Sequence, residues 1–293
     1  MEVSLEKGKR PNNHTRQTSP IGIDREKSSA LRGFRSLRDK ASGFFSEVGS
    51  MFIMGFQSIG LGLRNGFPVG EFVNQSWFLV RVSTLACIII SIPFGMIIAL
   101  EIGSLLQQVG AQTQLGAVMV LATVREQAPL ATLLVISGAG GAAITADLGS
   151  RVIRDEISAM EVMGISPLRG LVLPRLAAMT LLAVCFDGVV SIAGILGGLY
   201  FGEHPLHIST SSFFATFSDL SQLADLFISL FKSAVFGFLA AMVACYKGLN
   251  VKSGATGVGD AVNQGVVISF VLAFAVNFIL TVFYFNFVVQ KAI

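Results

Sequence analysis

Charged residues are scarce in this sequence. Asp, Glu, Lys and Arg make up only 13% of its 293 residues, whereas about a quarter of a soluble globular domain is charged. Apolar residues make up 53%, and the mean hydropathy is +0.70. The three cysteines stand alone inside apolar runs without a CxxC pair, so they predict neither a disulfide framework nor a zinc site. This composition argues against a soluble domain and favours a chain that lies in a membrane.

The motifs of several enzyme classes are also missing. The sequence has no GxxxxGK[ST] phosphate loop, so any ATP must be bound elsewhere. Gly138, Gly140 and Ala143 have the spacing of a dinucleotide-binding turn, but they lie inside an apolar segment with no preceding strand. His204 and His207 lack a third metal ligand. Without a nucleophile–base pair or a basic, aromatic-rich face, the sequence predicts neither an enzyme nor a nucleic-acid-binding protein.

The sequence does contain five apolar runs long enough to cross a bilayer, for which a helix needs about 20 residues. These runs cover residues 77–103, 115–149, 168–202, 223–246 and 265–289. Residues 44–66 are less apolar and predict an amphipathic helix on the membrane surface, with a sixth span as the alternative. Residues 1–43 are basic and poor in large apolar side chains, which predicts a disordered tail. The predicted fold class is therefore an all-α integral membrane protein with its folded domain at 44–293.

The distribution of Lys and Arg predicts the orientation of the chain. Basic residues occur in the N-terminal tail, in the segment 150–170 and in the loop 247–252, whereas the segments 104–114 and 203–222 have none. Loops rich in Lys and Arg stay on the cytoplasmic side of a membrane. We therefore expect a multi-pass protein of the plasma (inner) membrane with a cytoplasmic N-terminus.

A charged segment follows the second apolar run. Residues 151–163 predict an amphipathic helix on which Ile153, Ile157 and Met160 share one stripe and charged side chains cover the other side. Gly164 predicts its C-terminal end. The polar side mixes acids and bases, which favours docking into a groove of a cytosolic protein. A helix resting on the bilayer surface is the alternative, but such helices are usually rich in Lys and Arg alone.

Two ionisable residues lie deep inside apolar runs. Asp187 is near the middle of the third run, and Lys232 is at a comparable depth in the fourth. Charges at membrane depth are costly and face partners or cavities. We expect these two side chains to form an ion pair with a structural role, with a Lys232 that reaches to the membrane surface as the alternative. A proton relay through the same pair would instead indicate an ion-coupled secondary transporter.

Several spaced motifs carry a resemblance to a known family. They are VREQAP (124–129), the run 138–149, RDEISAMEVMGISPLRGLVLPR (154–175), FDGVVSIAGILGG (186–198), FKSAVFGF (231–238) and GATGVGDAVNQGVV (254–267). Together they resemble the MlaE/YrbE family of ABC-transporter permeases over about residues 45–290. The motifs ADLGS (146–150) and RDEISAMEVMG (154–164) are most similar to those of actinobacterial YrbE subunits of Mce lipid-import systems. The sequence departs from the commoner pattern at Gln127 and Asp147, where Leu and Glu are usual, and at 158–160.

The resemblance implies a role for the charged segment 151–163. In this family the helix after the second span is the coupling helix, which lies in a cleft of a separate ATPase subunit. The residues expected to meet the ATPase are Arg151, Arg154, Asp155, Glu156 and Glu161, with Ile157 and Met160 as anchors of the helix. ATP and magnesium would be bound by the ATPase, so the resemblance implies no cofactor in this chain.

The resemblance also implies a substrate pocket that opens outward. Arg125 and Glu126 are expected to line it, together with Glu101, Leu105 and Leu106 at a similar depth at the end of the first span. An apolar cavity with a few charges suits acyl chains and a polar headgroup. Anchoring of the helix at the interface is the alternative role for Arg125 and Glu126.

The implied assembly has three kinds of component besides this chain. A second permease, expected to be a paralogue, would complete the pathway, an ABC ATPase dimer would bind inside, and MCE-domain proteins would bind outside. The cargo implied is a lipid (a fatty acid, sterol or phospholipid), with import as the expected direction. The rival hypotheses are the secondary transporter that uses Asp187 and Lys232, and a non-transporting membrane scaffold.

Overall fold

A computed structural model describes residues 43, 46–62, 64, 66–252, 254–284 and 286. The predicted tail 1–43, apart from Gly43, lies outside these residues. The chain divides into a unit of residues 1–49 and a unit of residues 50–293, and the second holds the site described below. All regular secondary structure in the described residues is helical, which confirms the all-α prediction.

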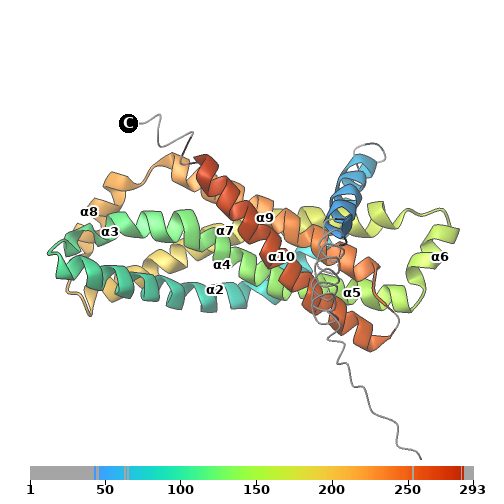
Figure 1. The fold of residues 1–293 in the computed structure, drawn as a ribbon, viewed down its shortest axis with the longest axis horizontal. Coiled ribbons are helices and arrows are strands. Elements are labelled where there is room, and N and C mark those ends of the chain that lie inside the picture. Colours follow the sequence, from blue (N-terminus) through green and yellow to red (C-terminus); the bar gives the residue numbers. More distant parts are fainter. Residues whose placement is uncertain are drawn as a thin grey trace, which may run out of the picture. The chain divides into compact units, whose positions relative to one another are not determined.

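Five helical segments of the described residues are long and apolar enough to cross a membrane (Figure 1). They are Val69–Gln108, Gln112–Ile153, Leu168–Glu203, Leu223–Leu249 and Ala255–Tyr284. Each coincides with one predicted run, so the number of spans is confirmed. Three of the five begin before the predicted apolar run, the last by ten residues, because hydropathy detects only the part of a helix that is apolar. Residues 50–62, within the predicted surface helix, are also helical and are not among these candidate spans.

The individual helices have the following bounds. The first and the last three long helices are α2 (Val69–Gln108), α7 (Leu173–Glu203), α9 (Leu223–Leu249) and α10 (Ala255–Tyr284). The second span consists of η1 (Gln112–Gln114), α3 (Leu115–Met119), η2 (Val120–Gln127), α4 (Ala128–Val135), η3 (Ile136–Gly141) and α5 (Ala142–Ile153). The third span consists of η4 (Leu168–Val172) and α7, and the connecting helices are α6 (Glu156–Val162) and α8 (Thr210–Leu220).

The contact between α2 and α7 depends on small residues. The buried face of α2 repeats every four residues, which is one helical row: Leu79, Ser83, Cys87, Ser91, Gly95, Ala99 and Gly103. A Cβ atom added to Gly95 would collide with the backbone oxygen of Gly194, and one added to Gly197 would lie 2.5 Å from the backbone oxygen of Ile92. Small residues let membrane helices approach backbone to backbone. These glycines thus bring α2 into close contact with α7.

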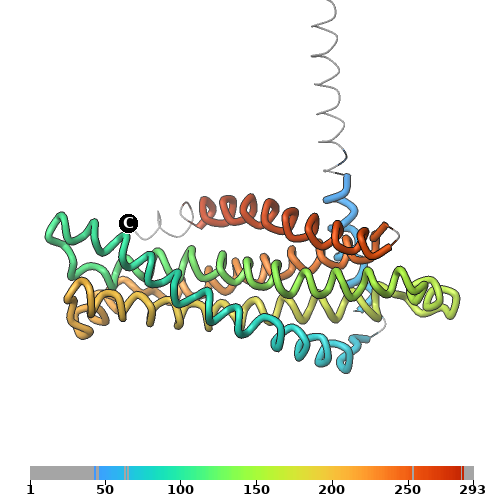
Figure 2. The backbone as a smooth tube through the Cα atoms, turned by 90° about the horizontal axis from the view of Figure 1, so that it is seen from below, coloured from blue at the N-terminus to red at the C-terminus, as the bar shows by residue number. Residues whose placement is uncertain are grey.

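The main apolar core lies between α4, η3, α5, α7 and α9. Figure 2 shows the first part of α2 on the side of these inner helices opposite α10, and α2 then runs diagonally across them. A second, smaller cluster includes Leu115 and Met119 of α3 and Phe213 of α8. Figure 1 shows α8 and α6 at opposite ends of the long helices. In the predicted orientation α8 lies outside and α6 inside.

Two stretches of the second span are π-helical, η2 and η3. A π-helical turn is wider than an α-helical one and redirects the side chains that follow it, and such turns are frequent at functional sites. Arg125 and Glu126 both lie in η2. The first π-helical stretch therefore positions the two charges that were expected to line the substrate pocket.

Candidate functional site

The charged segment after the second span is two helices rather than one. Helix α5 ends at Ile153, and α6 begins only at Glu156. Between them Asp155 adopts a left-handed conformation with φ 57°, which aspartate tolerates better than most residues. The prediction of one helix over 151–163 was therefore wrong at its start, and Ile153 does not share a helix with Ile157.

The C-terminal end of α6 agrees with the prediction. Gly164 has φ +75°, its backbone N–H donates to Glu161 O at 3.0 Å, and the N–H of Ile165 donates to Met160 O at 2.9 Å. This pattern closes a helix by satisfying its last carbonyl groups. Glycine is suited to the position because the left-handed conformation costs it nothing.

Helix α6 has one face on the protein and one face in the open. Ile157 and Met160 are partly buried and pack against the main core. Glu161 is exposed, and Val162 is 90% exposed at the end of the helix. A short helix that is held by an apolar stripe and offers charged and apolar side chains outward has the form of a docking surface.

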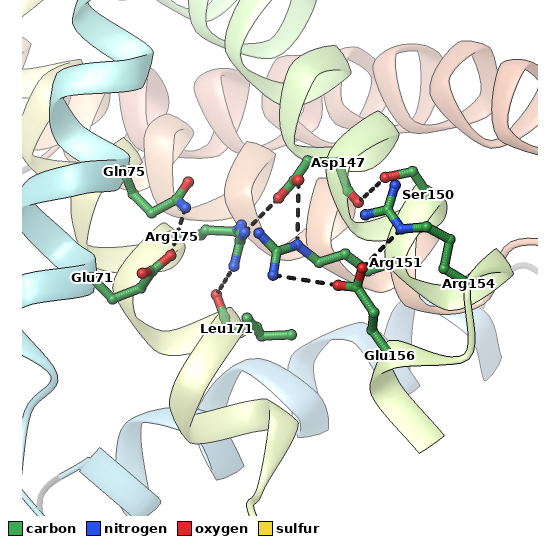
Figure 3. A network of polar contacts seen from close by, with 9 residues as sticks. All are labelled: Glu71, Gln75, Asp147, Ser150, Arg151, Arg154, Glu156, Leu171 and Arg175. Atoms are coloured by element: carbon green, nitrogen blue, oxygen red, sulfur yellow. Dashed lines mark hydrogen bonds and ion pairs between the residues drawn. The ribbon is translucent and has the colours of Figure 1, made fainter. Parts of the chain in front are cut away.

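A chain of ion pairs leads from α6 into the body of the protein (Figure 3). Arg151 Nη1 lies 3.7 Å from Glu156 Oε2, and Arg151 Nε donates to Asp147 Oδ1 at 3.3 Å. Arg175 Nη2 donates to Asp147 Oδ2 at 2.6 Å. Arg154 Nε lies 2.8 Å from Glu156 Oε1. Sequence reasoning gave Asp147 and Arg175 no role, although the i, i+4 spacing of Asp147 and Arg151 was a usable signal.

The second group of charges lies deep among the long helices. Lys232 of α9 lies 2.8 Å from Glu126 Oε1 of η2, and its Nζ also donates to Thr281 Oγ1 of α10 at 2.9 Å. Asn277 Nδ2 donates to Glu126 Oε2 at 3.4 Å. The Lys232 side chain is 2% exposed and the Glu126 side chain 37%. Glu126 is therefore the more accessible charge of this pair.

The expected ion pair between Asp187 and Lys232 is wrong in its partners. Among the described residues, the ion pair of Lys232 is with Glu126, and Asp187 Oδ2 accepts a hydrogen bond from Ser229 Oγ at 2.7 Å. Ser229 lies about one helical turn before Lys232 on α9. Comparing positions along the apolar runs placed Asp187 near the correct turn of α9. It could not decide whether Ser229 or Lys232 of that helix is the partner of Asp187.

Arg125 belongs to a separate contact at the start of α9. Its Nε donates to Asp225 Oδ1 at 2.6 Å, and its guanidinium carbon lies 5.2 Å from the centre of the Tyr284 ring. Tyr284 OH donates to Asp225 Oδ1 at 2.9 Å, and the backbone N–H of Gln222 donates to Asp225 Oδ2 at 3.2 Å. Asp225 was missed because an acid in the first turn of a helix is usually read as a capping residue, which it also is here.

The remaining predicted pocket residues lie nearer the outer end of α2. Gly95 packs on Gly194, and Gly194 in turn faces Thr123 and Gln127. Glu101 is six residues beyond Gly95 and therefore about 9 Å further along α2 than the level of Arg125 and Glu126. The expectation of a similar depth was wrong.

Leu105 and Leu106 follow in the next turn of α2. Leu105 is exposed, and Leu106 packs against the small outer cluster. Within the described part of this chain, the structure does not gather Glu101 and these two leucines around Arg125 and Glu126.

An apolar cavity of about 460 Å³ lies beside the Arg125–Asp225 contact. Its walls come from η2, α7, α8 and α9 and include Val124, Ser191, Phe217 and Asp225. A second apolar cavity of about 530 Å³ lies between α2 and α7. None of the five predicted pocket residues lines these two cavities. Among the described residues, no group of three His, Cys, Asp or Glu side chains could hold a metal ion.

Five long apolar helices and charges held between them define a multi-pass membrane protein. Residues 72–283 match the family described as Permease MlaE, and the chain belongs to this family. It is therefore a permease subunit of an ABC transporter and not itself an ATPase, and its family implies a complex with an ATPase.

Three relatives illustrate the range of the family. The "Probable ABC transporter permease protein" of Synechocystis is 32% identical over 69% of this chain and 78% of its own length. The "Intermembrane phospholipid transport system permease protein MlaE" of Haemophilus influenzae is 27% identical over 83% of this chain and 94% of its own length. The chloroplastic protein TRIGALACTOSYLDIACYLGLYCEROL 1 of Arabidopsis thaliana is 28% identical over 68% of this chain and 57% of its own length.

Proposed function

We propose that this chain moves lipids through the inner membrane as a permease that is driven by a separate ATPase through α6. The observation that carries the proposal is the form of α6, which packs its apolar stripe on the core and leaves a charged face open. A relative in Haemophilus influenzae is named for intermembrane phospholipid transport. Phospholipids, fatty acids and sterols are the amphipathic cargoes that fit the proposal.

Helix α6 and the turn before it would form the coupling element. The residues proposed to meet the ATPase are Arg151, Arg154, Asp155, Glu156 and Glu161, while Ile157 and Met160 anchor the helix to the permease. Mixed charges on this surface favour a protein partner over a lipid surface, since a membrane-surface helix is rich in Lys and Arg. ATP and magnesium would be held by that partner.

The proposed lipid pathway uses the charges of η2. Glu126 has the more exposed side chain of its ion pair and is proposed to address the headgroup, and Arg125 supports it from the contact with Asp225. Glu101 would line the pathway about 9 Å further toward the outer side than Arg125 and Glu126, with Leu105 and Leu106 in the next turn. There they would contact the acyl chains or the entrance of the lipid pathway. A single chain with five spans and one coupling helix forms half of a pathway, so a second permease would supply the facing wall.

The proposed complex contains two permeases, expected to be paralogues, an ABC ATPase dimer and MCE-domain proteins on the outer side. The resemblance of its sequence motifs to those of actinobacterial YrbE subunits favours import of the lipid. The positive-inside distribution of Lys and Arg supports a cytoplasmic N-terminus and a cytoplasmic α6.

Transport in proteoliposomes tests the proposal. The complex is purified through a tag on this chain and reconstituted, and transfer of a fluorescent phospholipid and of a fluorescent fatty acid is measured with ATP, without ATP, and after collapse of the proton gradient. ATP-dependent transfer that survives the collapse supports the proposal. Transfer that needs the proton gradient and ignores ATP would replace it with the secondary-transporter hypothesis.

A further inference from the structure

The ion pairs at the inner end of the helices connect three helices that the backbone separates. Arg151 at the end of α5 contacts Glu156 of α6 on one side and Asp147 on the other, and Asp147 contacts Arg175 near the start of α7 (Figure 3). The chain of contacts therefore runs from the proposed ATPase-facing helix to the third span. Helix α7 in turn packs on α2 and α9.

Arg175 is the buried end of this chain of contacts. The side chains of Glu156, Arg151 and Asp147 are 41%, 32% and 35% exposed, whereas that of Arg175 is 0% exposed. Arg175 Nη1 also donates to the backbone oxygen of Leu171 at 2.7 Å. A buried guanidinium without an anionic partner is strongly unfavourable, so Asp147 is held firmly at Arg175. The two ion pairs of Arg151 are weaker, because their side chains are partly exposed and water screens them.

The backbone between α5 and α6 is a joint. Arg154 and Asp155 interrupt the helix, and Asp155 is left-handed, so α6 is not a rigid continuation of α5. Without side-chain contacts, a displacement of α6 would be absorbed at this joint. Ile157 and Met160 hold α6 against the core by apolar contacts. The contact of Arg151 with Glu156 adds a polar link across the joint, and Asp147 connects it to Arg175.

From this geometry we infer that Arg151, Asp147 and Arg175 are positioning residues that transmit a displacement of α6 to α7. The inference rests on the proposed function, because it assumes that an ATPase moves α6. It assigns Arg151 an inward role, toward Asp147, in addition to its place at the docking surface. Three ion pairs link the surface helix α6 to the core helix α7 through discrete contacts, as a coupling path requires.

Arg151→Gln is the sharpest test variant. It removes the middle link and leaves the pair of Asp147 with Arg175 intact, so no buried charge is stranded. Because Arg151 also lies at the proposed docking surface, retention of the ATPase is measured beside transport. For each ATP hydrolysed, we expect the variant complex to move about 2- to 30-fold less lipid. Arg151→Lys should restore part of the loss, since one ammonium can still bridge two carboxylates. The matched control is Arg169→Gln, which removes an arginine whose Nε donates to Gly66 O.

A second variant tests the inner link. Asp147→Asn combined with Arg175→Gln removes both charges of this ion pair and avoids a buried guanidinium without a partner. It should lower the lipid moved per ATP by a similar factor, whereas Asp147→Glu should retain most of it. A normal yield of monodisperse complex shows that the variants fold.

Three outcomes would overturn the inference. Lipid moved per ATP that equals the Arg169→Gln control would do so. So would loss of the ATPase from the Arg151→Gln complex, which would place Arg151 in the ATPase interface alone and leave the proposed function standing. An equal fall in ATP hydrolysis and transport would also contradict it, because the two processes would remain coupled. A wild-type chain that never binds an ATPase would instead refute the proposed function.

Discussion

Replacing Glu126 with glutamine should destabilise the protein more than replacing its partner Lys232. The Lys232 side chain is only 2% exposed, so Glu126→Gln leaves a buried ammonium without its anion. Breaking a buried pair in this way costs about 3–5 kcal/mol. Lys232→Met leaves a carboxylate that is 37% exposed and still accepts hydrogen bonds from Asn277 and Thr281, so its cost should be about 1–3 kcal/mol.

The double variant Glu126→Gln/Lys232→Met provides the decisive comparison. It removes both charges, and such replacements are often close to neutral. Its free energy of unfolding, measured by steric trapping in micelles, should therefore lie closer to the wild type than that of Glu126→Gln alone. Additive costs of the two single changes would show that the side chains do not interact, and equal single costs would refute the reasoning from burial.

Two further changes test the helix packing and the Asp187 contact. Gly95→Ala should lower the free energy of unfolding by about 1–3 kcal/mol or more, because its Cβ would collide with the Gly194 backbone oxygen, whereas Gly138→Ala, with open space at the same atom, should be tolerated; equal unfolding energies for the two variants would contradict the close approach. Ser229→Ala should cost about 1–3 kcal/mol, since it leaves the buried carboxylate of Asp187 without its hydrogen bond, and an unchanged unfolding energy would show that the contact is unimportant.

The spans could be predicted from the sequence because burial in a bilayer needs a long apolar run, and each of the five runs supplied one. The C-terminal end of α6 could also be predicted, because glycine is favoured where the residue after a helix adopts the left-handed conformation, as Gly164 does. The beginning of α6 could not be predicted, because the charged and apolar residues around Asp155 fit a continuous amphipathic helix, and only the backbone conformation of Asp155 shows the break.

The partners of the buried charges could not be predicted from the sequence either, because they also depend on the local backbone conformation. Depth counting assumes a uniform rise and turn, but η2 is π-helical and redirects Arg125 and Glu126 toward different residues of α9. The rule that opposite charges at one depth pair with each other then chose Asp187 for Lys232, while the nearer acid was Glu126. The sequence shows which residues are charged, but it does not show toward which neighbouring helix each side chain points.

Co-purification of the ATPase tests the central claim, that α6 is the docking surface for a separate ATPase. The tagged chain is isolated in a gentle detergent, and the bound proteins are identified by mass spectrometry. Glu156→Arg/Glu161→Arg reverses two charges at α6, and the matched control Glu203→Arg/Asp219→Arg reverses two exposed charges in the segment 203–222. We predict that the wild type and the control retain an ABC ATPase and that the α6 variant loses it. An α6 variant that binds the ATPase as well as the wild type would contradict the account.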